Sequence, residues 1–329
     1  MAYFVKTIET DVMSRKMLEN RIWSALIASG CIEYGALERF VRQGGSFVTI
    51  PKRNKVADLE RVDISSASAL SPTAMSTTSD KAVVLRDVSF NSYLKHDAML
   101  SGDNISAGIS ADYGEKVAKR LIKQTSNVLT GAIQAIDTPT SNCHVKDLGN
   151  AALTAQAVRQ AKYLLGDAAD DLRVMLLHSK VFSDLLRDTS VTYSSLDSVS
   201  GTTVITGRVP GMFGLDMFIV SDQCYNSNVG TGSSGDDRYH TYLLGANSVQ
   251  IGWQAGPEIE VDKDITHPST KNLVKITADY VVHLAGVAYT GSANPTDATI
   301  QTASNWNEAY EDHREVPAAL IISNGNVYA

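Results

Sequence analysis

The sequence predicts an α+β protein, and three patterns support this fold class. Two β-rich segments, residues 46–51 and 81–94, flank a long polar stretch in the first third of the chain. A long segment from residue 112 has the hydrophobic period of a helix, and from residue 154 short helices alternate with strands. Two late strand-like segments, 258–265 and 272–289, then form an antiparallel pair, so strands and helices are partly segregated along the chain.

Composition is that of a protein with a large core. The chain has 329 residues, 43% of them hydrophobic. No stretch reaches 18 consecutive apolar residues, and charges interrupt the first twenty residues, so the sequence predicts neither a membrane span nor a signal peptide. Three widely spaced cysteines are typical of a chain kept reduced rather than of a disulfide framework.

Charge is unevenly distributed. The net charge is -7, but residues 1–140 contain 17 Lys and Arg against 15 Asp and Glu, whereas the remainder contains 12 against 21. Strong binding to nucleic acid depends on cations that displace counterions from phosphates, and the chain has no dense cluster of them. Any contact with DNA is therefore expected to be weak and non-specific.

The first third predicts a helix and a hairpin. Residues 10–29 have an amphipathic pattern that begins near Asp11 and ends before Gly30. The strands 46–51 and 81–94 read as the two arms of a hairpin. The polar residues between them have too little apolar surface to form a core, so this loop is expected to be mobile in the free subunit and ordered against a partner.

The helix with the strongest sequence signal is predicted to start at residue 112. Asp112 and Glu115 match a capping box, and apolar residues then recur at spacings of four and seven for about 25 residues. The opposite face carries four basic residues: Lys116, Lys119, Arg120 and Lys123. This face is either simply solvated or in contact with an acidic surface of a neighbouring molecule.

The second half predicts a mixed α/β unit. A helix spans about 154–166, a buried strand 172–178, and a short helix follows with Ser179 as its cap. A strand is expected at 214–222, a flexible loop at 225–238, and one further strand at 241–253.

The sequence contains no complete motif of an enzyme or of a metal site. The glycines of 230–235 match a dinucleotide fingerprint, but a strand does not lead directly into them and a helix does not follow. A calcium-like loop from Asp262 has His267 and Leu273 where glycine and glutamate are needed. No histidine pair has zinc-ligand spacing, and no nucleophile elbow is present. The sequence therefore predicts no catalytic, cofactor or metal site and no enzyme.

The order of these parts resembles the Hong Kong 97-type fold of tailed-bacteriophage major capsid proteins over essentially the whole chain. The resemblance rests on the segments 175–186, 211–222, 242–252 and 283–289, with 293–306 resembling the C-terminal segment of one group of these proteins. It implies an N-terminal arm (1–43), an extended loop (44–95), a peripheral domain with a spine helix (96–150), an axial domain (151–255), a peripheral sheet (256–291) and a C-terminal segment (292–329).

The resemblance also implies the function. Subunits would form pentamers and hexamers of an icosahedral shell that encloses the genome in the virion, after assembly in the host cytoplasm. Partners would be other copies, a separate scaffolding protein, a portal and possibly a decoration protein. Some relatives cross-link a loop lysine, and Lys52, Lys55 and Lys81 are near suitable places, but non-covalent assembly is expected.

The sequence leaves two rival functions open, and it leaves open whether the basic residues contact a neighbouring subunit. The same fold could form a nanocompartment around an enzyme, or, less compatibly with the sequence, the chain could be an α/β hydrolase with Ser179 as nucleophile. The basic residues could instead be merely solvated. The proposed inter-subunit contacts are Arg53, Lys55 and Arg61 at the loop base and Lys116, Lys119, Arg120 and Lys123 on the spine helix.

Overall fold

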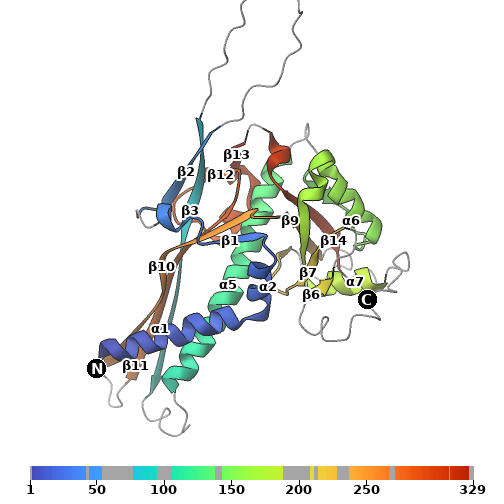
Figure 1. Cartoon of the computed structure of the whole chain (residues 1–329). Coiled ribbons are helices and arrows are strands. Elements are labelled where there is room, and N and C mark those ends of the chain that lie inside the picture. Colours follow the sequence, from blue (N-terminus) through green and yellow to red (C-terminus); the bar gives the residue numbers. More distant parts are fainter. Residues whose placement is uncertain are drawn as a thin grey trace, which may run out of the picture.

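The computed structural model contains two large β-sheets and a small two-stranded one, with a long helix between the two large sheets and a pair of helices at the N-terminus (Figure 1). It describes residues 2–41, 44–53, 77–94, 105–137, 143–187, 208–210, 214–227, 237–266, 271–310 and 312–325. No helix within these ranges is long and apolar enough to cross a membrane.

The N-terminal helix is longer than predicted and is broken. Helix α1 spans Ala2–Glu19 and α2 spans Arg21–Ala28. The side chain of Asn20 accepts hydrogen bonds from two backbone N–H groups at the start of α2, so Asn20 caps the second helix. The predicted cap at Asp11 is wrong, because α1 already began nine residues earlier.

The first sheet has five strands in the order β1-β10-β11-β3-β2. Their bounds are β1 Ile32–Tyr34, β10 Val249–Asp264, β11 Lys271–Leu284, β3 Thr77–Leu94 and β2 Phe47–Arg53, and the four-residue helix α3 spans Glu38–Val41. Strands β2 and β3 pair antiparallel from Phe47 opposite Val83 to Arg53 opposite Thr77, which confirms the predicted hairpin arms. Strands β10 and β11 confirm the late antiparallel pair. The strand predicted over 272–289 nevertheless ends at Leu284, because a turn at Gly286 leads into the separate strand Val287–Tyr289.

One predicted strand is two strands in different sheets. The segment predicted as a single strand over 241–253 contains the end of β9 (Arg238–Gly245) and the start of β10. A turn separates them, and Asn247 adopts φ 53°, a left-handed conformation that asparagine tolerates better than most residues. This turn carries the chain from the second sheet to the first.

Helix α5 (Ile105–Ile136) is the longest helix and contacts both sheets (Figure 1). It begins seven residues before the predicted capping box, so Asp112 lies inside the helix and is not its cap. Two glycines allow close approach. A Cβ on Gly114 would lie 2.4 Å from the carbonyl oxygen of Met13 in α1, and one on Gly131 would lie 2.1 Å from that of Ile300.

The second sheet has seven strands, in the order β4-β14-β9-β5-β7-β6, with β8 paired to β9. The bounds are β4 Val145–Asp147, β5 Leu172–Leu177, β6 Arg208–Pro210, β7 Met217–Val220, β8 Asn226–Ser227 and β14 Ala318–Asn324. Three helical segments accompany it: α6 Ala155–Lys162, the 3-10 segment η1 Tyr163–Asp171 and α7 Ser179–Arg187. The predicted alternation of helix and strand is confirmed, although the helix after Thr154 changes to 3-10 geometry.

The residues that follow β11 connect the two large sheets. They contain α9 Asp297–Gln301, two 3-10 turns, η2 Ala303–Asn305 and η3 His313–Glu315, and two short paired strands, β12 Val287–Tyr289 and β13 Trp306–Glu308. Strand β14 then inserts between β4 and β9. The C-terminal segment therefore supplies a central strand to the sheet that also contains β5 and β7.

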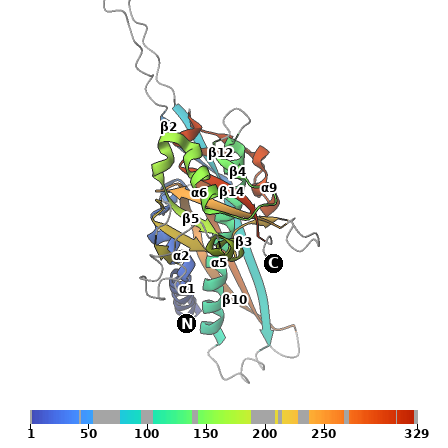
Figure 2. The ribbon, with the colours of Figure 1, turned by 90° about the vertical axis from the view of Figure 1, so that its right-hand side faces the viewer.

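The main core lies around α5. Buried residues of α2, α5 and both sheets form one apolar cluster, which includes Trp23, Leu129 and Tyr242. A second cluster packs α6 and α7 against the other face of the second sheet. Beyond this core, the far ends of β3, β10 and β11 extend as a three-stranded ribbon with α1 and the start of α5 on its inner face (Figures 1 and 2). We call this part, residues 84–94, 258–264 and 271–281, the distal ribbon.

Candidate assembly surfaces

Of the three cations at the base of the extended loop, the structure describes only the backbone of Arg53. Arg53 is the last residue of β2, and its backbone is opposite Thr77. The side chain of Arg53, and all of Lys55 and Arg61, lie outside the described residues, as does the polar loop that was expected to be mobile. Their role as inter-subunit contacts stays a prediction.

The base of the hairpin is fixed to the body by a buried contact between a carboxylate and a histidine. The carboxylate of Asp80 in β3 is 2.9 Å from Nε2 of His283 in β11, and both side chains are almost fully buried. The backbone N–H of Gly286 donates to the same carboxylate at 2.8 Å. Burial raises the pKa of Asp80, but the nearby imidazole of His283 and the hydrogen bond from Gly286 outweigh it, so the pKa of Asp80 is lowered. This pair holds β3 firmly where the loop begins.

The ammonium of Lys52 lies beside this pair. It sits 3.2 Å from the ring centroid of Tyr310, as a cation–π contact at the base of the hairpin. Burial lowers the pKa of Lys52, against the opposing effect of Asp80. The lysine is thus used within the subunit.

The basic face of α5 is divided between exposed and engaged side chains. Lys119 pairs with Glu115 one turn away at 2.6 Å, an exposed pair of small energetic value. Lys116 lies 5.6 Å from the ring centroid of Tyr113 and is exposed. Lys123 is 3.7 Å from the carboxylate of Asp297. Three of the four cations therefore keep substantial exposure to solvent.

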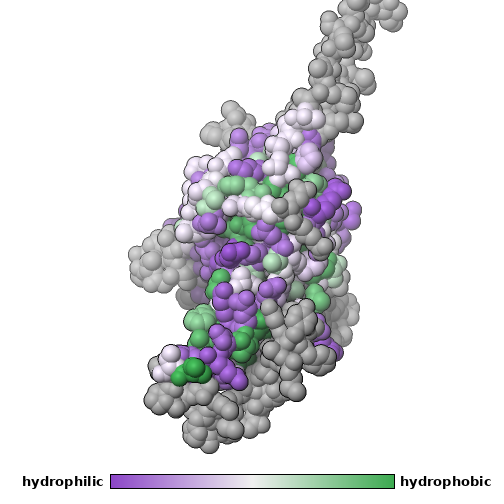
Figure 3. All heavy atoms as spheres, turned by 90° about the vertical axis from the view of Figure 1, so that its left-hand side faces the viewer, coloured by the Kyte–Doolittle hydropathy of each residue, from purple (hydrophilic) through white to green (hydrophobic). Residues whose placement is uncertain are grey.

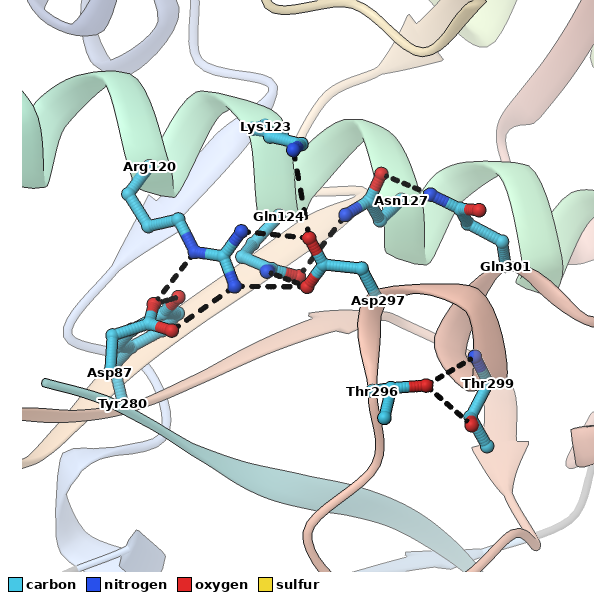
Figure 4. A network of polar contacts seen from close by, with 10 residues as sticks. All are labelled: Asp87, Arg120, Lys123, Gln124, Asn127, Tyr280, Thr296, Asp297, Thr299 and Gln301. Carbon is cyan, nitrogen blue, oxygen red and sulfur yellow. Dashed lines mark hydrogen bonds and ion pairs between the residues drawn. The ribbon is translucent and has the colours of Figure 1, made fainter. Parts of the chain in front are cut away.

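Arg120 is different because it joins three elements within the subunit (Figure 4). Its guanidinium donates to both oxygens of Asp87 in β3, at 3.0 and 3.1 Å, and to both oxygens of Asp297 at the start of α9, at 2.8 and 2.9 Å. Tyr280 of β11 donates its hydroxyl proton to Asp87 at 2.5 Å. Two bidentate, charge-assisted contacts of this kind fix geometry strongly.

Neutral side chains extend this network along α5. Gln124 donates to Asp297 at 2.7 Å, and Gln301 of α9 donates to Asn127 at 2.8 Å (Figure 4). Burial raises the pKa of Asp297, but hydrogen bonds from Arg120 and Gln124 outweigh it and lower the pKa. The network thereby attaches the C-terminal segment to the spine helix. An additional inter-subunit role for Arg120 stays a prediction.

The outer face of the distal ribbon has two columns of different chemistry. The strand register places Glu258, Glu260, Asp262 and Asp264 of β10 along one side. It places Val88, Phe90 and Leu94 of β3 along the other, with exposed fractions of 54, 63 and 39%. Figure 3 shows this face, with an apolar area at its lower left next to polar side chains. Sequence reasoning missed these columns because they depend on the register of three strands.

A cluster near α7 bears on the hydrolase alternative. Ser179 donates its hydroxyl proton to Asp222, so its oxygen is paired with a carboxylate and not with a histidine. His178 accepts the backbone N–H of Lys180 at Nδ1, while Nε2 is 3.8 Å from Asp222. Burial lowers the pKa of His178. The groups are adjacent, but the histidine is not arranged to take a proton from the serine, as nucleophilic catalysis requires.

The described part of the chain contains no group of three or more His, Cys, Asp or Glu side chains positioned to hold a metal ion. Cys31, Cys143 and Cys224 are buried and are not joined in disulfides. Burial raises the pKa of Cys31, which disfavours a reactive thiolate.

Comparisons with known proteins agree with this architecture. No curated protein matches the chain by sequence. Among solved structures, the capsid asymmetric unit of cyanophage Pam1 has a TM-score of 0.59 and 14% identity over 87% of each chain. The capsid of Ralstonia phage GP4 has a TM-score of 0.57 and 9% identity, over 78% of this chain and 84% of that one. Mycobacterium phage Che8 has a TM-score of 0.53 and 13% identity, over 90% and 89%.

At these identities the likeness establishes the fold, which is the α+β Hong Kong 97-type capsid fold. A family model adds the sequence-level assignment: the model for major capsid protein 13-like sequences matches residues 53–318, most of the chain. The chain therefore belongs to the major capsid protein 13-like family and is a structural subunit of a phage capsid.

Proposed function

We propose that copies of this chain assemble as pentamers and hexamers into a closed icosahedral shell around a phage genome, in the host cytoplasm. The family match over residues 53–318 carries this proposal. Assembly would be non-covalent and would use other copies as the principal partner. A separate scaffolding protein would guide assembly, and a portal, with or without a decoration protein, would complete the virion.

The extended loop would lie across the distal ribbon of a neighbouring subunit. Its base carries Arg53, Lys55 and Arg61, while the outer face of β10 presents four carboxylates in a column. Lys275 reaches Glu260 at 3.4 Å, an exposed ion pair. The side chains of Glu258, Glu260 and Asp262 are exposed to solvent. Opposite charges on such surfaces steer partners and set their register more than they add affinity.

Lys116, Lys119 and Lys123 would add a second set of contacts with an acidic neighbour. Each exposed ion pair contributes only about 0–1 kcal/mol. A subunit held by several neighbours nevertheless leaves only when all contacts release together, so weak pairs accumulate into a stable shell. The overall net charge of -7 also suits an interior along which DNA lies without tight binding.

Reversing the three loop-base charges tests this arrangement. The variant with Arg53, Lys55 and Arg61 all changed to glutamate is expected to form fewer shells, because the loop would meet the acidic column with like charge. The defect should be larger at low salt, where the Debye length rises from about 10 Å at 0.1 M to about 30 Å at 0.01 M. Sedimentation at two ionic strengths measures it. The matched control is Lys146→Glu, a charge reversal in β4 of the second sheet.

Circular dichroism of the free subunit should be unchanged in the triple variant if these cations contact only a neighbouring subunit, since substitutions away from a core usually shift stability by about 0.5 kcal/mol or less. Normal shells at low salt would contradict the placement of the loop. An unfolded subunit would show instead that these cations stabilise the subunit itself.

Two rival functions give different results. A nanocompartment would copurify with a single enzyme as cargo instead of packaging a genome. A hydrolase would react with a serine-directed probe and lose the label in Ser179→Ala. The pairing of Ser179 with Asp222 disfavours the second rival.

A further inference from the structure

Strand β3 has a free edge along the distal ribbon. On one side it pairs with β11 from Val84 to Leu94. On the other side its pairing with β2 ends at Val83, followed by one hydrogen bond from the Val84 N–H to the carbonyl of Ser46. Beyond that point no strand among the described residues pairs with this edge, and in Figure 2 the lower part of β3 runs along the margin of the ribbon. Its outward backbone groups are therefore available to another strand.

This edge lacks the usual protection against pairing. From Val88 to Leu94 the sequence is VSFNSYL, without a charge or a proline. Strand β10, at the opposite margin of the ribbon, carries alternating carboxylates and register shifts between Trp253 and Glu258. Charged residues and bulges are the common means of protecting an edge. The contrast indicates that the β10 edge is protected against pairing with another strand, whereas the β3 edge is available for it.

A groove lies beside the open edge. A cavity of about 310 Å³ lies between α5 and the strands β3 and β11. Its lining includes Val117, Ile276 and Ala278 together with the charged groups of Asp87, Lys116 and Arg120. Ser89 and Val88 of β3 also line it. The inner face of the strand is joined to α5 on either side of this groove, because Arg120 donates to Asp87 and the side-chain amide of Asn91 donates to the hydroxyl of Tyr113. The groove between these contacts leaves room for a side chain of an added strand.

We propose that the β3 edge pairs with the same edge of a second copy of this chain, antiparallel about a twofold axis centred at Asn91. The inference rests on the proposed function, which supplies identical copies at high local concentration. A neutral edge offers nothing to attract a charged segment, but it is self-complementary. With Asn91 at the centre, Val88 of one copy faces Leu94 of the other, so apolar side chains pair on the outer face.

This contact differs in kind from the one made by the extended loop. A loop that lies across the next subunit makes a heterologous contact, which generates rings. Pairing of β3 with itself is isologous, so it would join a subunit of one ring to a subunit of the adjacent ring. Together the two contacts give the rings and the links between rings that a closed shell requires.

Single-cysteine variants test the register. In an antiparallel pair, directly opposed Cα atoms are about 4.5–5.5 Å apart, within the range of about 4.4–6.8 Å that a disulfide spans. Asn91→Cys would therefore face its own symmetry mate, and mild oxidation of assembled shells should convert most of it to a disulfide-linked dimer. The native cysteines are buried and should remain unreacted.

Val88→Cys is the matched control, since it lies on the same strand and is exposed. Its symmetry mate would be six residues away in register, or roughly 20 Å at about 3.3 Å per residue. It should stay monomeric alone, whereas Val88→Cys combined with Leu94→Cys should form dimers. Non-reducing gels of the three variants give the result.

Two outcomes would overturn the inference: shells in which Asn91→Cys stays monomeric, or equal cross-linking of Asn91→Cys and Val88→Cys. A monomeric Asn91→Cys variant would mean that another strand, such as one of a different protein, occupies the edge. Equal cross-linking would mean that the disulfides form by random collision between subunits. In both cases shells are present, so the proposed function survives. Failure of the unmodified chain to form shells would contradict the proposed function itself.

Discussion

Replacing Gly131 with alanine is expected to destabilise the subunit by about 1–3 kcal/mol, the usual cost of overpacking a well-packed site. The added Cβ would lie 2.1 Å from the carbonyl oxygen of Ile300 and 2.6 Å from Nε1 of Trp306. These two groups hydrogen-bond to each other at 2.7 Å, so neither can move without loss. Urea denaturation of the free subunit, followed by circular dichroism, measures the effect.

Gly108→Ala on the same helix is the matched control. A Cβ at this position would meet nothing within 4 Å. Alanine is favoured over glycine in a helix by up to about 1 kcal/mol, so this variant should be as stable as the original or slightly more stable. Equal shifts in both variants would mean that helix propensity, and not the contact with the C-terminal segment, decides the result.

Arg120→Ala should lower the free energy of unfolding of the subunit by roughly 1–3 kcal/mol. It would leave the carboxylates of Asp87 and Asp297 without the cation that they share, so their negative charges would repel each other. The figure is below the value for a fully buried pair because about a third of the Arg120 side chain is exposed to solvent. Lys119→Ala, one residue away, removes only an exposed pair with Glu115 and should cost about 0.5 kcal/mol or less.

The difference between the Arg120→Ala variant and the original should depend on pH. Because the pKa of Asp297 is lowered in the folded subunit, the stabilisation is present above its unfolded pKa of about 3.9 and is lost as the pH falls through the folded value. The two proteins should thus differ most near neutral pH and converge in acid. A constant difference from pH 7 to pH 3 would exclude Asp297 as the principal partner.

The sequence predicted the elements that are marked by the composition and hydrophobic pattern of their own residues. The hairpin arms β2 and β3 and the pair β10 and β11 were found because their segments are rich in β-forming residues. Helix boundaries were less successful. Asp112 and Glu115 match a capping box, but α5 continues through them from Ile105, because a capping pattern inside a helix looks the same as one at its start.

Contacts between distant residues could not be predicted. The basic face of α5 was visible, yet nothing in the sequence distinguishes Arg120 from its neighbours, since its partners Asp87 and Asp297 lie far away in the chain. The two strands in 241–253 read as one because both are apolar and the turn at Asn247 is short. The columns on the distal ribbon required the strand register.

Electron microscopy of the purified chain in negative stain tests the central claim most directly. If the chain is a capsid subunit that assembles with itself, the grids should show closed shells or tubes with walls one subunit thick. Monodisperse particles no larger than single subunits, at concentrations and ionic strengths that keep the protein folded, would contradict it.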